Sequence, residues 1–105
     1  MIVQIHTDNY IESSDRLTAQ VEALVASAVA HFADRVSRVQ VHLGDENSDS
    51  KGGANDKRCM IEARLDGRPP VAVTHQAPTL DQAMDGAAEK LQRSISSTLE
   101  RLRDR

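Results

Sequence analysis

The stretch that decides the fold is residues 56–75, DKRCMIEARLDGRPPVAVTH. Apolar and polar residues alternate over Lys57–Leu65, which is the period of a strand with one buried face. Asp66-Gly67 is a tight-turn signal, so the next strand is expected to fold back antiparallel. Pro69-Pro70 favours an edge position for that strand, because proline lacks the backbone N–H that a central strand needs.

Two more strands precede this pair. The alternation over Ile2–His6 and again over Val39–Leu43 predicts strands. Between them, apolar residues at helical spacing predict a helix that is capped by Ser13 or Ser14 and runs to about Phe32.

A second helix follows the last strand. Thr79 and Gln82 fit a capping box, and apolar residues at helical spacing continue over Leu80–Leu102. The segment Gly44–Asp56 is polar and glycine-rich. Because it buries almost nothing, we expect it to be the most mobile internal segment.

The resulting order is β-α-β-β-β-α, an α+β fold with a four-stranded mixed sheet. A strand–helix–strand crossover places the first two strands parallel. Two helices with one apolar stripe each cover only one face of the sheet, so the other face is expected to stay open. The residues expected beneath the helices are Val3, Ile5, Val39, Val41, Cys59, Ile61, Val71 and Val73. The open face is expected to carry Gln4, His6, Arg38, Gln40, His42, Arg58, Glu62, Arg64, Thr74 and Gln76.

Composition sets the class of protein. The 105 residues, 39% apolar and 28% charged, suit a single domain over residues 1–105. One cysteine excludes an internal disulfide framework and a CxxC zinc site. No apolar run approaches the roughly 18 residues of a membrane span, and no signal peptide is visible, so we expect a cytoplasmic protein without a membrane partner.

Charge is distributed unevenly. Residues 1–50 carry three basic and eight acidic groups, a net −5, whereas residues 51–105 carry ten basic and eight acidic groups, a net +2. The net charge of −3 argues weakly against a generic nucleic-acid coat, but a local basic face can still bind phosphate.

Two sets of basic residues are candidates for such a face. One shares a stripe of the last helix: Lys90, Arg93, Arg101 and Arg105. The other lies on the open face or at strand ends: Arg38, Lys57, Arg58, Arg64 and Arg68. The alternative for the first set is an ordinary solvated helix face. For the second set it is cross-strand ion pairing with Glu62.

The sequence gives less support to base stacking, metal binding, a reactive thiol or catalysis. One Phe and one Tyr nearly exclude binding by stacking bases on aromatic rings. His6 and His42 share the open face, but a structural metal site normally needs four ligands, so we predict no metal and no cofactor. Cys59 has core parity, which favours a buried, inert thiol. No P-loop, GxGxxG or GxSxG motif is present, so we predict no enzyme and no small-molecule substrate.

Together with the element order, three stretches of the chain resemble the ribosome hibernation-promoting factor family, also known as ribosome-associated translation inhibitors or ribosomal subunit interface proteins. They are IVQIHTDNYIESSDRL (2–17), the segment 56–75 and TLDQAMDGAAEKLQRSI (79–95). The most specific piece is Leu80–Leu91, which matches a pattern of the type Asp-x-Ala-x-Asp-x-Ala-x-Asp-Lys-Leu.

The resemblance implies a β-α-β-β-β-α domain that binds the small ribosomal subunit and its rRNA in the channel used by mRNA and tRNA. Such a protein would inhibit translation and protect idle ribosomes under stress. The chain resembles the short type, which lacks a C-terminal dimerisation domain, and we expect a monomer. The alternative is a protein-interaction or regulatory module on the same fold. A basic cleft between the last helix and the sheet edge would favour ribosome binding, and scattered ion pairs would favour the alternative.

Overall fold

The computed structural model describes residues 1–46 and 56–103. Its elements are β1 (Ile2–Thr7), α1 (Asp15–Ala28), the 3-10 helix η1 (Ala30–Arg35), β2 (Val36–Asp45), β3 (Lys57–Leu65), β4 (Val71–Ala77) and α2 (Leu80–Arg103). The predicted β-α-β-β-β-α order is confirmed, with η1 added. Most of the segment that we expect to be mobile lies outside the described residues. Gly44 and Asp45 belong to β2 and not to a loop.

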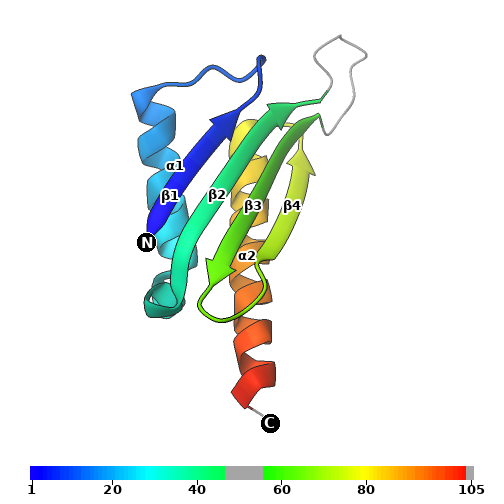
Figure 1. Ribbon diagram of the computed structural model, residues 1–105. Coiled ribbons are helices and arrows are strands. Elements are labelled where there is room, and N and C mark those ends of the chain that lie inside the picture. The colour runs from blue at the N-terminus through cyan, green and yellow to red at the C-terminus, as the bar shows by residue number, and fades with distance from the viewer. Residues whose placement is uncertain (47–55, 104–105) are drawn as a thin grey trace.

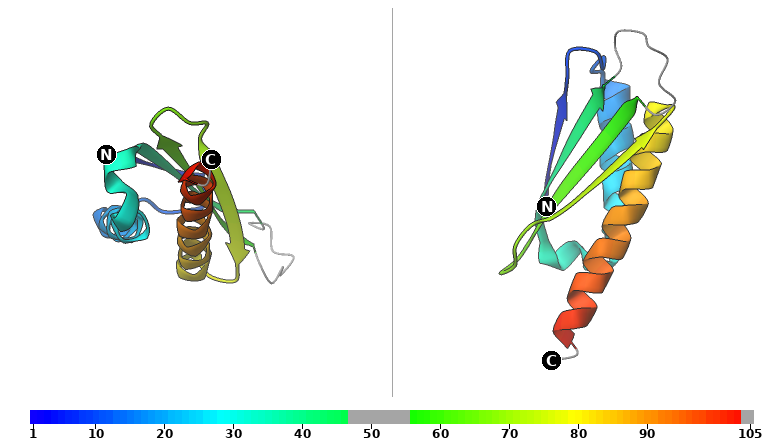
Figure 2. Two further views of the ribbon diagram at one scale, coloured as in Figure 1. Left: turned by 90° about the horizontal axis from the view of Figure 1, so that it is seen from below. Right: turned by 90° about the vertical axis from the view of Figure 1, so that its right-hand side faces the viewer.

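The sheet has the order β1-β2-β3-β4 (Figure 1). β1 pairs parallel to β2, and the other two pairings are antiparallel. β4 is an edge strand, as Pro69-Pro70 indicated. Both α1 and α2 lie on the same side of the sheet, which leaves its other face uncovered (Figure 2).

The covered face holds the core. Five of the eight residues expected there are buried, namely Val39, Val41, Cys59, Ile61 and Val71. Val3, Ile5 and Val73 have the predicted orientation but are only partly buried. The expectation of burial was wrong for these three, which all lie on the edge strands β1 and β4, where a residue has a neighbouring strand on one side only.

The first helix is shorter than predicted. Its N-cap is Ser14, whose Oγ accepts a hydrogen bond from the Leu17 N–H at 3.0 Å. The α-helix ends at Ala28 and does not reach Phe32. The chain tightens there, with the Phe32 N–H donating to the Val29 carbonyl at 2.8 Å. This i→i+3 bond is the 3-10 geometry, and it lets the fully buried Val29 fill the core at the turn towards β2.

The second helix packs on β3 and β4. Thr79 Oγ1 accepts from the Gln82 N–H at 3.1 Å, as the predicted cap requires. The helix buries one side against the strands through Ala83, Met84, Ala87, Ala88, Leu91 and Ile95. Its C-terminal end extends past the ends of the strands (Figures 1 and 2). No helix in the described ranges is long and apolar enough to cross a membrane.

Candidate nucleic-acid interface

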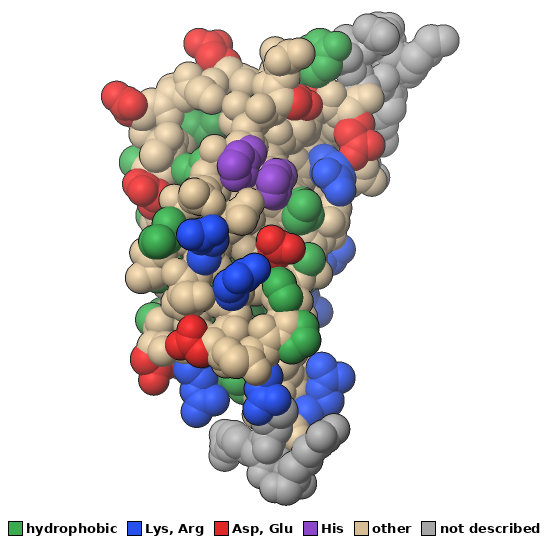
Figure 3. Space-filling view, in the orientation of Figure 1, with side chains coloured by type: hydrophobic (Ala, Val, Ile, Leu, Met, Phe, Trp, Pro, Cys, Tyr) green, Lys and Arg blue, Asp and Glu red, His purple; other side chains and the backbone are tan. Residues whose placement is uncertain are grey.

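The open face of the sheet is polar, as the alternation predicts. Figure 3 looks onto this face and shows Lys and Arg side chains grouped over its middle and its lower end, with a pair of histidines above them. The pairing of the strands fixes which side chains are neighbours. Across β1, β2 and β3, one row holds His6, His42 and Met60, and the next holds Gln4, Gln40 and Glu62.

A β-bulge shapes the next row. Val36 and Val39 are both buried while Ser37 and Arg38 between them are exposed, and the pairing with β3 shifts between Val36 and Arg38. The Ser37 hydroxyl donates to the Arg64 carbonyl at 3.3 Å. A bulge inserts one residue and re-aims the side chains that follow. Past the bulge, Arg38 lies directly opposite Arg64, in the same register as the rest of the β2–β3 pairing.

Arg38 and Arg64 therefore place two like charges side by side. Cβ atoms of facing residues in an antiparallel pair lie about 5 Å apart, and like charges there are destabilising. Both side chains are exposed, and none of the ion pairs among residues 1–46 and 56–103 includes either of them. The alternative of cross-strand pairing with Glu62 is thus not found. Two neighbouring guanidinium groups that form no ion pair with any described residue have the chemistry that suits an anion.

The other predicted basic residues of the sheet already have acidic partners. Lys57 Nζ lies 3.1 Å from Asp45 Oδ2 and 3.5 Å from Asp56 Oδ2. Its hydrogen bond to Asp45 raises the pKa of the Lys57 ammonium. Arg58 Nε lies 3.2 Å from Glu46 Oε1. Both cations at this end of the sheet are therefore paired with carboxylates, unlike Arg38 and Arg64.

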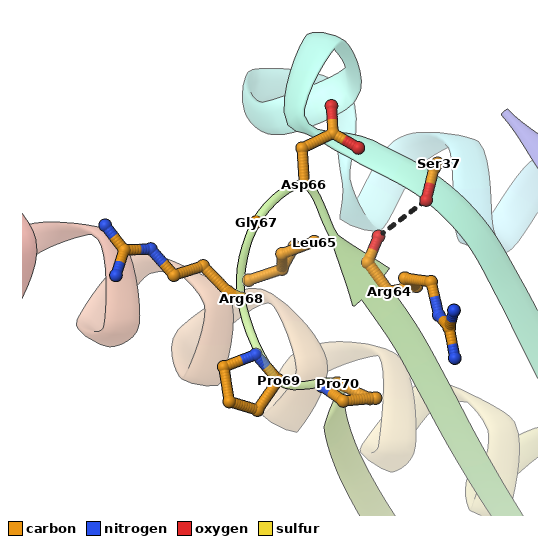
Figure 4. A pocket seen from close by; sticks show the side chains of 8 residues that line it. All are labelled: Ser37, Arg64, Leu65, Asp66, Gly67, Arg68, Pro69 and Pro70. Atoms are coloured by element: carbon orange, nitrogen blue, oxygen red, sulfur yellow. Dashed lines mark hydrogen bonds between the residues drawn. The ribbon is translucent and has the colours of Figure 1, made fainter.

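Arg68 follows the turn between β3 and β4. Gly67 adopts a left-handed backbone with φ of 70°, and the Arg68 N–H donates to the Leu65 carbonyl at 3.2 Å, so the predicted tight turn is present. The turn borders a shallow hollow to which both Arg64 and Arg68 contribute. Figure 4 shows their guanidinium groups pointing away from each other. Arg68 is exposed but does not join Arg64 in one cluster.

The basic stripe of α2 lies on the helix side of the sheet. Lys90 Nζ donates to the Thr74 carbonyl of edge strand β4 at 2.9 Å. Arg93 Nη2 pairs with Glu89 Oε1 at 2.7 Å. Arg101 is exposed on the end of α2 that extends past the strands, and Arg105 lies outside the described residues. The structure thus separates this stripe from Arg38 and Arg64, and Lys90 is directed to backbone at the sheet edge.

The two histidines of the open face form a stack. The His6 and His42 ring centroids are 4.7 Å apart and the rings are inclined by 16°. Burial lowers the pKa of His42, and the nearby His6 and Arg58 charges add to this while Glu62 opposes it. No group of three or more metal-ligating side chains occurs within the described part of the chain. The stack was missed because only Phe, Tyr and Trp were counted as stacking residues. The parallel register of two strands with His at matching positions could have indicated it.

Cys59 is part of the core. Its side chain is completely inaccessible to solvent, as the strand parity predicts. Burial raises the pKa of the Cys59 thiol to about 12. A buried thiol with a raised pKa holds its proton, as in structural cysteines, whereas reactive cysteines have a lowered pKa.

Comparison with known proteins identifies the family of the chain. The model of the family described as Sigma 54 modulation protein / S30EA ribosomal protein matches residues 3–103. The chain belongs to this family. The resemblance to ribosome hibernation-promoting factors is thereby confirmed. None of the curated protein sequences compared with the chain matches it significantly.

Solved structures share the fold of this S30EA-family chain. The N-terminal domain of Thermus thermophilus Protein Y superposes with a TM-score of 0.73 at 19% identity, over 93% of this chain and 99% of that one. A ribosomal subunit interface protein from Coxiella burnetii superposes with a TM-score of 0.69 at 14% identity, over 95% of this chain and 99% of that one.

Proposed function

We propose that this S30EA-family protein binds the small ribosomal subunit through its rRNA and inhibits translation by occupying the mRNA and tRNA channel. Membership of a family whose description names a ribosomal protein supports a ribosome-associated role. The observation that carries the proposal is the facing pair of Arg38 and Arg64, two exposed cations that form no ion pair with any residue of 1–46 or 56–103 on an otherwise polar face.

The pair suits the RNA backbone. A guanidinium is always charged and donates in a planar fork that matches phosphate oxygens. Contacts to phosphate fix position without reading sequence, as a protein that occupies a fixed place on a large RNA requires. Arg101 at the projecting end of α2 offers a further contact, and Lys90, Arg93 and Arg68 form the outer parts of the proposed interface.

The proposed mode of action is occupancy without catalysis. On this proposal the protein acts as a monomer in the cytoplasm, as a factor of ribosome hibernation under stress, without cofactor or small-molecule substrate. The folded domain needs only to fill space and bind phosphate, which the rigid sheet and the projecting α2 allow.

A second candidate is a protein-interaction module with weak or no rRNA affinity. The observation that favours it is the engagement of Lys57, Arg58 and Arg93 with carboxylates, which removes three of the predicted cations from a basic surface. The two candidates differ in their response to salt, because binding to RNA releases counterions from each contacted phosphate.

Cosedimentation of the purified protein with 30S subunits over a salt series tests the proposal. Affinity should fall with a log–log slope of about −0.7 to −0.9 for each phosphate contact. The double reversal Arg93→Glu/Arg101→Glu should weaken binding while thermal stability stays nearly unchanged, since exposed ion pairs contribute little to folding. Cys59→Ala is the matched control, with some loss of stability and no direct loss of binding. Failure to cosediment with 30S or 70S particles even at low salt would favour the interaction module.

A further inference from the structure

We propose that the His6–His42 ring pair is a stacking platform for an unpaired nucleobase of single-stranded RNA, whose phosphates Arg38 and Arg64 bind farther along the same face. This inference rests on the proposed function, since it names the RNA conformation that the open face recognises. It identifies two residues that basic-patch reasoning does not select.

The first argument is the geometry of the rings. The 4.7 Å separation and 16° inclination describe two flat rings stacked on a solvent-facing surface. Within the row, His42 lies between His6 and Met60, whereas His6 lies on the edge strand β1 and no strand follows it. The row is therefore open at His6. Unpaired RNA bases stack on histidine as well as on the larger aromatic rings.

The second argument is the space beside the rings. A surface hollow next to the stack is lined by His6, His42, Gly44 and Arg58, among others. At Gly44 the Asp8 carboxylate occupies the space that a side chain would take, so the carboxylate borders the hollow directly. The hollow gives a planar group room to lie against the ring pair, and it is independent of the ring geometry.

The charge on the open face also changes along the strands, from acidic groups at one end to basic groups at the other. Beyond the histidines, the rim of the hollow carries the carboxylates of Asp8 and Glu46 and one guanidinium, Arg58, which is paired with Glu46. The excess of carboxylate disfavours phosphate there and suits the amino groups of bases. Arg38 lies on the other side of the histidines, four residues before His42 on the same strand. At the usual rise per residue, this is a distance of about 13 Å. A strand of a few nucleotides can span this distance. The base therefore goes to the histidines and the backbone to the arginines.

Direct titration of a fluorescently labelled single-stranded RNA of mixed sequence tests this. The variants are His6→Ala, His6→Phe as the rescue, and Gln4→Ala as a matched control on the same face of β1. We expect His6→Ala to weaken binding about fivefold or more, the lower end of what base stacking on a ring contributes. His6→Phe should restore affinity, and Gln4→Ala should leave it near the wild-type value. A matched RNA with abasic sites should bind weakly and equally to all of them.

The inference is overturned if the wild-type protein does not bind the RNA, if His6→Ala binds it as tightly as wild type, or if abasic RNA binds as tightly as complete RNA. Cosedimentation with 30S subunits, run in parallel, separates the two proposals. If the wild type cosediments but His6→Ala does not change the affinity for RNA, only the stacking platform is overturned. RNA binding that depends on His6 without cosedimentation overturns only the ribosomal function.

Discussion

The two faces of the sheet are made by alternate residues of the same strands, yet they are organised by different forces. On the covered face Val39, Cys59 and Ala63 are fully inaccessible and pack beneath α1 and α2. One residue along, the open face carries Arg38 and Arg64, like charges that lie directly opposite each other, an arrangement that is destabilising. On the covered face, a side chain must fit the volume that the core leaves for it. The second face keeps a locally unfavourable charge pair, as a binding surface does.

On the proposed function, the covered face provides stability and the open face provides binding. The largest effect is expected from truncating a side chain of the core. Leu91→Ala on α2 removes a fully buried side chain facing the sheet, and we expect the free energy of unfolding to fall by about 2–5 kcal/mol in urea titrations. Arg64→Ala on the open face is the matched control, with an expected change within about 0.5 kcal/mol. Equal losses in the two variants would abolish the distinction.

Gly86→Ala sharpens the account of the covered side. A glycine in a helix costs about 1 kcal/mol relative to alanine, so this substitution usually stabilises. Here a Cβ at Gly86 would collide with the His75 ring, which packs against the helix at that point. We expect a loss of about 1–3 kcal/mol from overpacking, measured by thermal or urea unfolding. In a His75→Ala background the same change should become stabilising, and a loss in both backgrounds would show that His75 is not the cause.

The reactivity of the Cys59 thiol tests whether this residue is buried on the covered face. Because burial raises the pKa of its thiol to about 12, a thiol reagent should not modify the folded protein at neutral pH and should modify it fully in denaturant. Cys59→Ala should cost about 1 kcal/mol of stability, close to the mean for single substitutions. Rapid modification under native conditions would place the thiol outside the core.

The smallest expected effect concerns His42 on the open face. Its pKa is lowered from the ordinary 6.5, so the folded state binds this proton less readily than the unfolded state. Stability is therefore present above about pH 6.5 and is lost as pH falls through the lowered folded pKa. His42→Gln should remove part of the drop in melting temperature on acidification. His31→Gln, at an exposed position on η1, is the control and should leave that drop unchanged.

The strands and their two faces followed from alternation alone because side-chain parity is local. Other features depended on contacts that parity does not encode. The bulge at Ser37 breaks the period between Val36 and Val39, and the register of β2 against β3 decides that Arg38 faces Arg64. The ion pairs of Lys57 follow from its place opposite Asp45, which requires the register of β2 against β3. The end of α1 at Ala28 was missed because the apolar spacing continues to Phe32 through a 3-10 turn.

The most direct test of the account is 30S cosedimentation of Arg38→Glu/Arg64→Glu beside Arg93→Glu/Arg101→Glu, two double reversals with the same change in net charge. The account predicts a loss of affinity of tenfold or more for the sheet pair, since each charged hydrogen bond contributes about 1.5–3 kcal/mol. It predicts a smaller loss for the helix pair, where Arg93 is already paired with Glu89. Both variants should keep the wild-type melting temperature. Wild-type binding by the sheet variant, or a larger loss in the helix variant, would contradict the assignment of binding to the open face.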